Sequence, residues 1–152
     1  MGLAQDIAAF EAKLGAAVED TMEREVFLNA GLAIVQSVFP NVYERYDPDE
    51  YVRRYEAGGL ADPRNMEITE RRYDRAGGRY EIEVRNMTEG VDGEGPIDQV
   101  IEKGVGYDWK GSRIYRQQPY PRPFYEAAEK IAAEGGYVES ALRDGLRRHG
   151  MK

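Results

Sequence analysis

Residues 66–85 read MEITERRYDRAGGRYEIEVR, and this stretch sets the architecture of the chain. Side chains of different polarity alternate along both of its halves, and residues 74–78 between them end in Gly77-Gly78. A period of two on both arms of a glycine turn is typical of a β-hairpin. We therefore predict two antiparallel strands, over residues 66–73 and 80–85.

Helical patterns lie on both sides of this hairpin. In residues 3–39 apolar side chains recur every three or four positions, and Pro40 is expected to end the pattern. Gly15 and Gly31 lie inside it, so a single helix and two helices broken near Asp20-Thr21 both remain open. After the hairpin, the sequence predicts a short helix over 97–101 stopped by Gly104, and helices over 124–133 and 138–148.

This order predicts an α+β fold, with an antiparallel sheet flanked by a long N-terminal helix and by C-terminal helices. We expect a single domain over residues 1–152. It comprises a helical part (1–40), a Tyr- and Arg-rich connector (41–65), and the sheet with the C-terminal helices (66–150). Within it we expect a helical turn over 48–55, a loop over 86–96 and an extended segment over 107–115.

Composition excludes several kinds of chemistry. The 152 residues include no Cys and one His, so disulfides, thiol nucleophiles and most zinc sites are excluded. The net charge is −7, with 28 acidic and 21 basic side chains and no long basic stripe, which argues against nucleic-acid binding. No unbroken apolar run is long enough for a membrane span, and the first ten residues lack a basic start. We expect a soluble cytoplasmic protein without a membrane partner.

Carboxylates are the remaining candidates for chemistry. Two acidic groups lack the spacing of a calcium loop, so we predict neither metal nor cofactor. Glu81 and Glu83 alternate on a strand opposite basic residues, which is typical of cross-strand charge pairs, although a hydrolase using Glu81 or Asp108 is conceivable. His149 lies near the chain end and is a poor general base. We therefore predict that the chain is not an enzyme. The acidic groups are Asp47, Asp49 and Glu50, and Asp92, Glu94 and Asp98.

Tyrosine and arginine are interleaved in two segments. These residue types are enriched at protein interfaces because each buries a large flat area and keeps a polar end. They could equally pin an irregular connector onto the domain; a third use, stacking of single-stranded bases, suits the acidic charge least. The two sets are Tyr43, Tyr46, Tyr51 and Tyr55 with Arg45, Arg53 and Arg54, and Tyr115, Tyr120, Phe124 and Tyr125 with Arg113, Arg116 and Arg122.

These segments also carry a family resemblance. Residues 42–54 read VYERYDPDEYVRR and are followed by GGLAD at 58–62, and the C-terminal half contains IEKG at 101–104, GYDW at 106–109 and YPRPF at 120–124. Over residues 25–150 the chain resembles small virion proteins of long-tailed bacteriophages and prophages, of the tail-completion or head-to-tail joining (neck) type. The glycine-rich stretch 90–96 departs from that pattern.

The resemblance implies a virion structural protein without catalysis, assembled in the host cytoplasm into a hexameric ring at the phage neck. Its partners would be further copies of itself, the tail-tube protein and a neck or connector protein; terminator and joining roles both remain open. An alternative is a stand-alone ligand-binding or regulatory domain whose Tyr-rich connector lines a pocket. The residues implied to shape the connector and the entry to the terminal helix, as interface or structural motif, are Tyr43, Tyr46, Pro48, Tyr51, Arg53, Arg54, Gly58, Gly59, Leu60, Trp109, Pro121, Arg122, Pro123 and Phe124.

Overall fold

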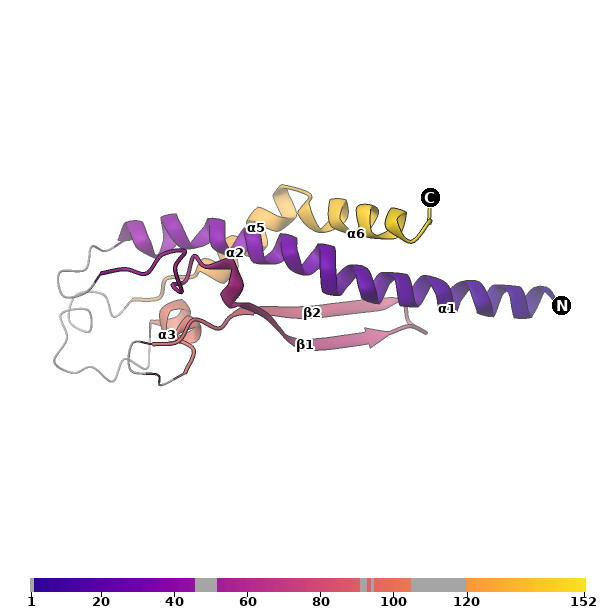
Figure 1. Ribbon diagram of the computed structural model, residues 1–152, viewed down its shortest axis with the longest axis horizontal. Coiled ribbons are helices and arrows are strands. Elements are labelled where there is room, and N and C mark those ends of the chain that lie inside the picture. Colours follow the sequence, from indigo (N-terminus) through magenta and orange to yellow (C-terminus); the bar gives the residue numbers. More distant parts are fainter. Residues whose placement is uncertain (1, 46–51, 91–92, 94, 105–119) are drawn as a thin grey trace.

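The computed structural model describes residues 2–45, 52–90, 93, 95–104 and 120–152. One long helical run forms the axis of an elongated molecule, with a β-hairpin along one side and two C-terminal helices along another (Figure 1). The run consists of α1 (Leu3–Thr21), a π-helical turn η1 (Met22–Val26) and α2 (Phe27–Asn41). The predicted α+β class, with an antiparallel sheet flanked by these helices, is confirmed.

The helical run is continuous where the sequence left a break open. The π-helical turn begins directly after Thr21, and its extra residue shifts the buried face, so that Val26 faces the core as Ala17 does. Pro40 does not end the helix as predicted. It lies in the last turn of α2, which ends one residue later at Asn41, and the amide of the capping residue Val42 donates to the Val38 carbonyl at 2.8 Å.

The predicted hairpin is confirmed as β1 (Met66–Asp74) and β2 (Arg79–Asn86). Its register is shifted between Ile68 and Glu70. A simple alternation would place Tyr73 and Ile68 on different faces of β1. The bulge exchanges the two faces beyond it, and Tyr73 joins Tyr80 in the smaller core cluster.

The remaining elements follow the predicted order. They are the 3₁₀ turns η2 (Tyr43–Arg45) and η3 (Pro63–Asn65), then α3 (Asp98–Lys103), α5 (Phe124–Glu134) and α6 (Tyr137–Arg148). Gly104 caps α3 with φ +65°, and Gly136 separates α5 from α6 with φ +64°. The helical turn predicted over 48–55 is wrong for residues 52–54, which have no regular structure, and its beginning lies outside the described residues, as does the extended segment 107–115.

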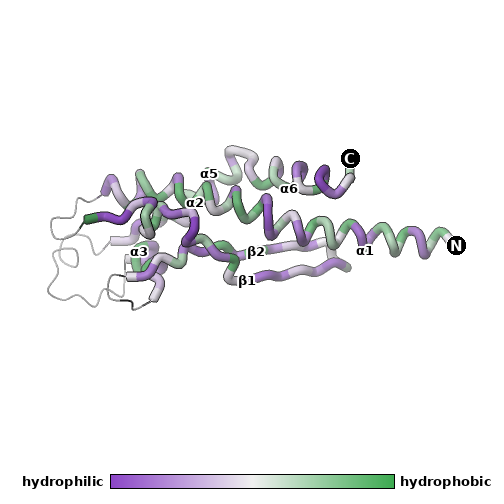
Figure 2. Tube along the Cα trace, in the orientation of Figure 1, coloured by the Kyte–Doolittle hydropathy of each residue, from purple (hydrophilic) through white to green (hydrophobic). Residues whose placement is uncertain are grey.

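Two clusters of buried side chains hold these elements together. The larger joins α2, the connector, α3 and α5 around Val38 and Phe124, both 0% exposed. The smaller joins η1 to the hairpin and α6 around Met22 and Val26. Hydrophobic residues recur along α1 and α2, whereas the hairpin is mainly hydrophilic (Figure 2).

The apolar character of the helical run corrects one expectation. The run Leu3–Arg45 contains a stretch that is long and apolar enough to cross a membrane by length and composition, where the sequence pattern predicted none. Helices of a protein core meet the same criterion, and α2 contributes Ala33, Ile34 and Val38 to the larger cluster.

Candidate interaction surfaces

Tyr43 and Arg53, both predicted as motif residues, contact each other inside the connector. The Tyr43 ring is 9% exposed, and its hydroxyl accepts a hydrogen bond of 3.1 Å from the Ala61 amide. The Arg53 guanidinium lies 5.2 Å from the centre of that ring and donates to the Tyr43 carbonyl at 2.8 Å. The rings of Phe39 and Tyr55 pack edge to face against the Tyr43 ring, with centroid distances of 5.2 and 4.9 Å. These contacts fasten the connector to the end of α2.

The glycine motif Gly58-Gly59-Leu60 forms a turn and a core anchor. Gly58 has φ +86°, and a Cβ on Gly59 would lie 2.5 Å from the Tyr55 carbonyl oxygen, so both positions require glycine. Leu60 is 5% exposed, and its carbonyl accepts a 2.7 Å bond from the buried Asn86 side chain. The motif therefore joins the connector to the end of β2.

Two further connector residues complete this attachment. Arg54 is exposed and donates to the Glu89 carbonyl at 2.6 Å. Asp62, which is 2% exposed, accepts bonds from the Gly58 amide and from Arg64, and the hydrogen bonds from Arg64 lower the pKa of this carboxyl below its usual range. Asp62 is absent from the predicted site because a carboxylate that holds a loop leaves no trace in sequence periodicity.

In the second motif, Pro121-Arg122-Pro123-Phe124, successive side chains are exposed and buried in turn. Arg122 and Phe124 are buried, whereas Pro121 and Pro123 are exposed. The Arg122 amide donates to the Ile101 carbonyl at 3.0 Å, and Pro123 directly precedes α5. The motif thus fixes where α5 begins, next to α3. The other predicted residues, Tyr46, Pro48, Tyr51 and Trp109, lie outside the described residues.

A buried polar hub that the sequence did not predict lies beside this motif. Asp98, at 0% exposure, accepts two bonds of 2.8 and 2.9 Å from Arg85 and one of 2.7 Å from the Tyr125 hydroxyl. The same hydroxyl accepts the Asn86 amide at 2.7 Å. Burial raises the pKa of Asp98, but the bonds from Arg85 and Tyr125 outweigh it and the net pKa is lowered; burial also raises the pKa of Tyr125. The hub joins β2, α3 and α5.

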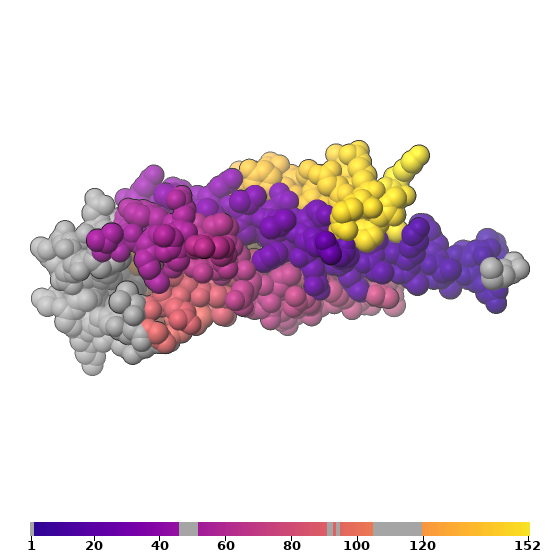
Figure 3. Space-filling model, in the orientation of Figure 1, coloured from indigo at the N-terminus to yellow at the C-terminus, as the bar shows by residue number. Residues whose placement is uncertain are grey.

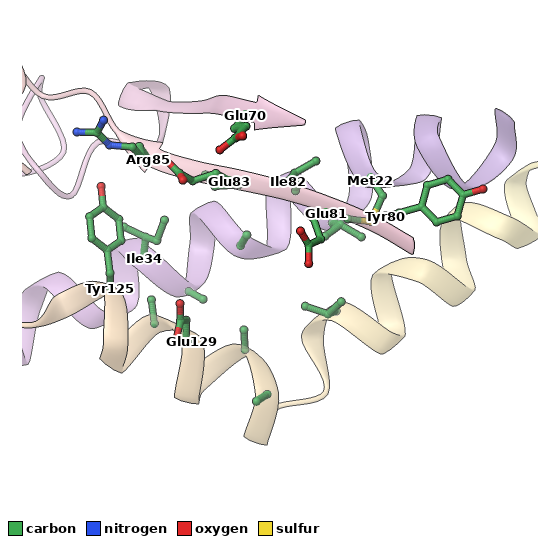
Figure 4. Close-up of a pocket in the computed structure, with 18 of the residues that line it drawn as sticks. Met22, Ile34, Glu70, Tyr80, Glu81, Ile82, Glu83, Arg85, Tyr125 and Glu129 are labelled. Carbon is green, nitrogen blue, oxygen red and sulfur yellow. The ribbon is translucent and has the colours of Figure 1, made fainter. Parts of the chain in front are cut away.

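A cleft of about 1,090 Å³ lies between β2 and α5, with α2 as its floor (Figure 4). Six consecutive residues of β2, from Tyr80 to Arg85, line it, which means that the strand presents its edge to the cleft. Tyr43 and Tyr55, the connector tyrosines that the structure describes, lie elsewhere. Several small apolar residues line the floor and the opposite wall, together with Tyr125 and Glu129 of α5; the small residues include Ala30, Ala33, Ala128 and Ala132.

Carboxylates surround this cleft and are engaged mostly in surface pairs. Glu81 pairs with Arg79 at 2.6 Å and with Arg72 at 3.7 Å, and Glu83 accepts a bond from the Thr69 hydroxyl at 2.9 Å. The predicted cross-strand pairing of Glu81 with Arg72 is therefore present. Among the described residues no group of three or more His, Asp or Glu is arranged to hold a metal ion.

Large apolar side chains remain exposed on the helical run. On α2 these are Leu28 at 61%, Leu32 at 52% and Phe39 at 36% exposure. They recur at helical spacing on the side of α2 away from the buried Ile34 and Val38. These exposed apolar groups make the outer face of α2 a candidate interaction surface.

Comparison with known proteins locates the chain in a family. No curated protein and no solved structure matches the chain. A family described as YomN matches residues 6–148, which covers the helical run, the hairpin and both C-terminal helices. That family is associated with prophages. The chain belongs to the phage-related YomN family.

Proposed function

We propose that this chain is a structural protein of the virion, a tail-completion or head-to-tail joining component that assembles into a hexameric ring at the phage neck. Membership of a phage-related family supports the class of protein. The resemblance of residues 42–65 and 101–124 to neck proteins supports the specific role. In this proposal the chain performs no catalysis and uses neither cofactor nor metal.

The observation that carries the proposal is the apolar outer face of α2. A protein that acts alone gains nothing from keeping Leu28 and Leu32 mostly in water, because each favours an apolar environment. A ring component covers such a face in every copy by contact with the next one. Large apolar and aromatic anchors of this kind carry most of the binding energy at protein interfaces.

The proposed partners follow from this role. Neighbouring copies of the chain would form the ring, the tail-tube protein would contact one side, and a neck or connector protein the other. The net charge of −7 suits a part that surrounds a DNA passage, because acidic surfaces repel the duplex. The protein would assemble in the host cytoplasm and remain in the neck of the virion, without membrane or sequence-specific nucleic-acid contacts.

A complementation experiment tests the proposal. The gene is deleted from the phage or prophage that encodes it and restored on a plasmid as wild type, as Leu28→Ser/Leu32→Ser, or as the control Gln36→Ser, which alters an exposed polar residue of the same helix. We expect the deletion to yield separate heads and tails in negative-stain images. Wild type and the control should restore joined particles, and the double variant should not.

The folding of the double variant is checked separately. Because both leucines are more than half exposed, its thermal midpoint should lie close to that of wild type. Complete, infectious particles in the absence of the gene would contradict the proposed role.

A further inference from the structure

The first half of α1 extends beyond the rest of the molecule. It projects past the tip of the hairpin and past the C-terminal end of α6 (Figures 1 and 3). Gly15, at the end of the projecting part, lies beside the side chains of Arg75 and Tyr80. Leu3, Ile7 and Phe10 on the projecting part are 76%, 48% and 60% exposed.

These side chains form one stripe with a coiled-coil spacing. Leu3, Ile7, Phe10 and Leu14 follow one another at alternating steps of four and three, and the same steps lead on to Ala17 and Thr21. The last two are buried, and Thr21 lies against Gly145 of α6. The stripe, which is exposed at Leu3, Ile7 and Phe10 and half-buried at Leu14, therefore continues a helix–helix seam that α6 covers at one end only.

The charges beside the stripe distinguish between the two ways in which two such helices can pair. Asp6 and Lys13 flank it on one side, and Glu11 flanks it on the other. In an antiparallel pair with Leu3 opposite the partner's Leu14, Asp6 faces the partner's Lys13, and the reciprocal contact is identical. In a parallel pair in register, Asp6 faces the partner's Glu11, and the charges repel.

We propose that two copies of the chain associate through residues 3–14 of α1, paired antiparallel, with Leu3 opposite the partner's Leu14 and Ile7 opposite the partner's Phe10. The projecting geometry permits this contact because the hairpin and α6 of each copy lie on the far side of residues 3–14 from those of the other copy. The contact is two-fold and therefore does not join neighbours within the cyclic ring proposed above. It describes the free protein before assembly, so either proposal can fail without the other.

A second copy suits this stripe better than an anionic membrane. Residues 3–14 contain two acidic side chains and one basic one, whereas helices that lie on membranes carry an excess of Lys and Arg. A second identical helix supplies an apolar partner for Leu3, Ile7 and Phe10, which are exposed in the single chain. The contact is small, so the dimer should form reversibly with rising concentration.

A charge-exchange experiment tests the pairing. Sedimentation equilibrium is measured for wild type, Asp6→Lys, Lys13→Asp and the double variant Asp6→Lys/Lys13→Asp. We expect each single change to raise the dissociation constant of the dimer by about tenfold, because both contacts between positions 6 and 13 become repulsive. The double variant should restore the wild-type value. A parallel pair gives a different result, in which Asp6→Lys alone strengthens the dimer through the partner's Glu11.

Cysteine cross-linking gives the register independently, because the natural chain contains no Cys. In Leu3→Cys/Leu14→Cys, oxidation should join position 3 of one copy to position 14 of the other. Trypsin separates the two positions at Lys13, so mass spectrometry identifies the joined peptides. The control Ala12→Cys, on the opposite side of the helix, should form no dimer. Joined identical positions, a monomer at every concentration, or binding to anionic phospholipid vesicles without self-association would overturn the proposal.

Discussion

Asn86 shows at the residue scale how the irregular half of the molecule is held. Its side chain is fully buried, donates to the Leu60 carbonyl at 2.7 Å and accepts the Thr88 amide at 3.0 Å. Its own amide donates to the Tyr125 hydroxyl. Through its side chain and its backbone N–H together, Asn86 therefore ties the connector, the end of β2 and α5 to one another, next to the Asp98 hub.

Replacing this residue should be costly. In Asn86→Ala the Leu60 carbonyl and the Thr88 amide lose their partners in the interior, and we expect the free energy of unfolding to fall by about 2–4 kcal/mol. Urea denaturation followed by circular dichroism measures the change. The control Thr69→Ala removes an exposed hydrogen bond to Glu83 and should change stability by less than about 0.5 kcal/mol. Equal effects of the two changes would contradict this account.

Individual residues of the candidate site were only partly predictable. The sequence identified Tyr43 and Arg53 but left open whether they join a partner or fasten the connector, and the structure shows contacts of the second kind. Asn86, Asp62 and Asp98 were not recognised as anchors. Their partners are far away in sequence, so composition and periodicity contain no signal for them.

At the scale of elements, the predictions are correct where the hydrophobic period changes at a glycine pair. The hairpin, α5 and α6 were predicted to within about two residues because Gly77-Gly78 and Gly135-Gly136 mark their ends. The π-helical turn and the bulge after Ile68 were not predicted. Each inserts one residue into a regular period, and the resulting shift is visible only once the buried face is known.

The contact between α1 and α6 offers a test at this scale. A Cβ on Gly145 would collide with the side chain of Thr21, which is fully buried and bonded to the Ala17 carbonyl. We expect Gly145→Ala to lower the free energy of unfolding by about 1–3 kcal/mol, although alanine favours helix. Thermal unfolding measures this, and Thr21→Ala/Gly145→Ala should recover part of the loss.

Gly15→Ala is the matched control in the same pair of helices. A Cβ on Gly15 would lie 3.1 Å from the Arg75 side chain and 3.2 Å from the Tyr80 hydroxyl, which is a close contact that small shifts can relieve and not a collision. We expect a gain of roughly 0–1 kcal/mol from helix propensity. If Gly15→Ala lowered the free energy of unfolding as much as Gly145→Ala does, the cost would come from replacing any glycine inside these helices and not from the contact with Thr21.

At the scale of the whole molecule, an ionic cluster connects the C-terminal end of α6 to the middle of the long helical run. Arg148 binds Asp20 at 2.5 Å and Glu25 at 2.8 Å, and His149 Nε2 lies 2.9 Å from Asp20. The hydrogen bond from Arg148 and the weaker effect of the one with His149 lower the pKa of Asp20 from 3.8 to about 2. The C-terminal helix is thereby fastened to the long N-terminal helix.

The lowered pKa predicts a pH dependence. Because Asp20 holds its proton less tightly in the folded state, its contribution to stability is complete above about pH 4 and is lost as the pH falls towards 2. We expect Asp20→Asn to lower the thermal midpoint at pH 6, and the gap from wild type to close near pH 2. A gap that stays constant across this range would contradict the role of the Asp20 carboxylate.

The central claim is that this member of a phage-related family is a structural part of the virion. The most direct measurement is quantitative mass spectrometry of density-purified particles from the phage or prophage that encodes it. The account predicts that the chain is present at a fixed copy number per particle, that of one hexameric ring. Its absence from purified particles, while it is present in the infected or induced cells, would contradict the claim.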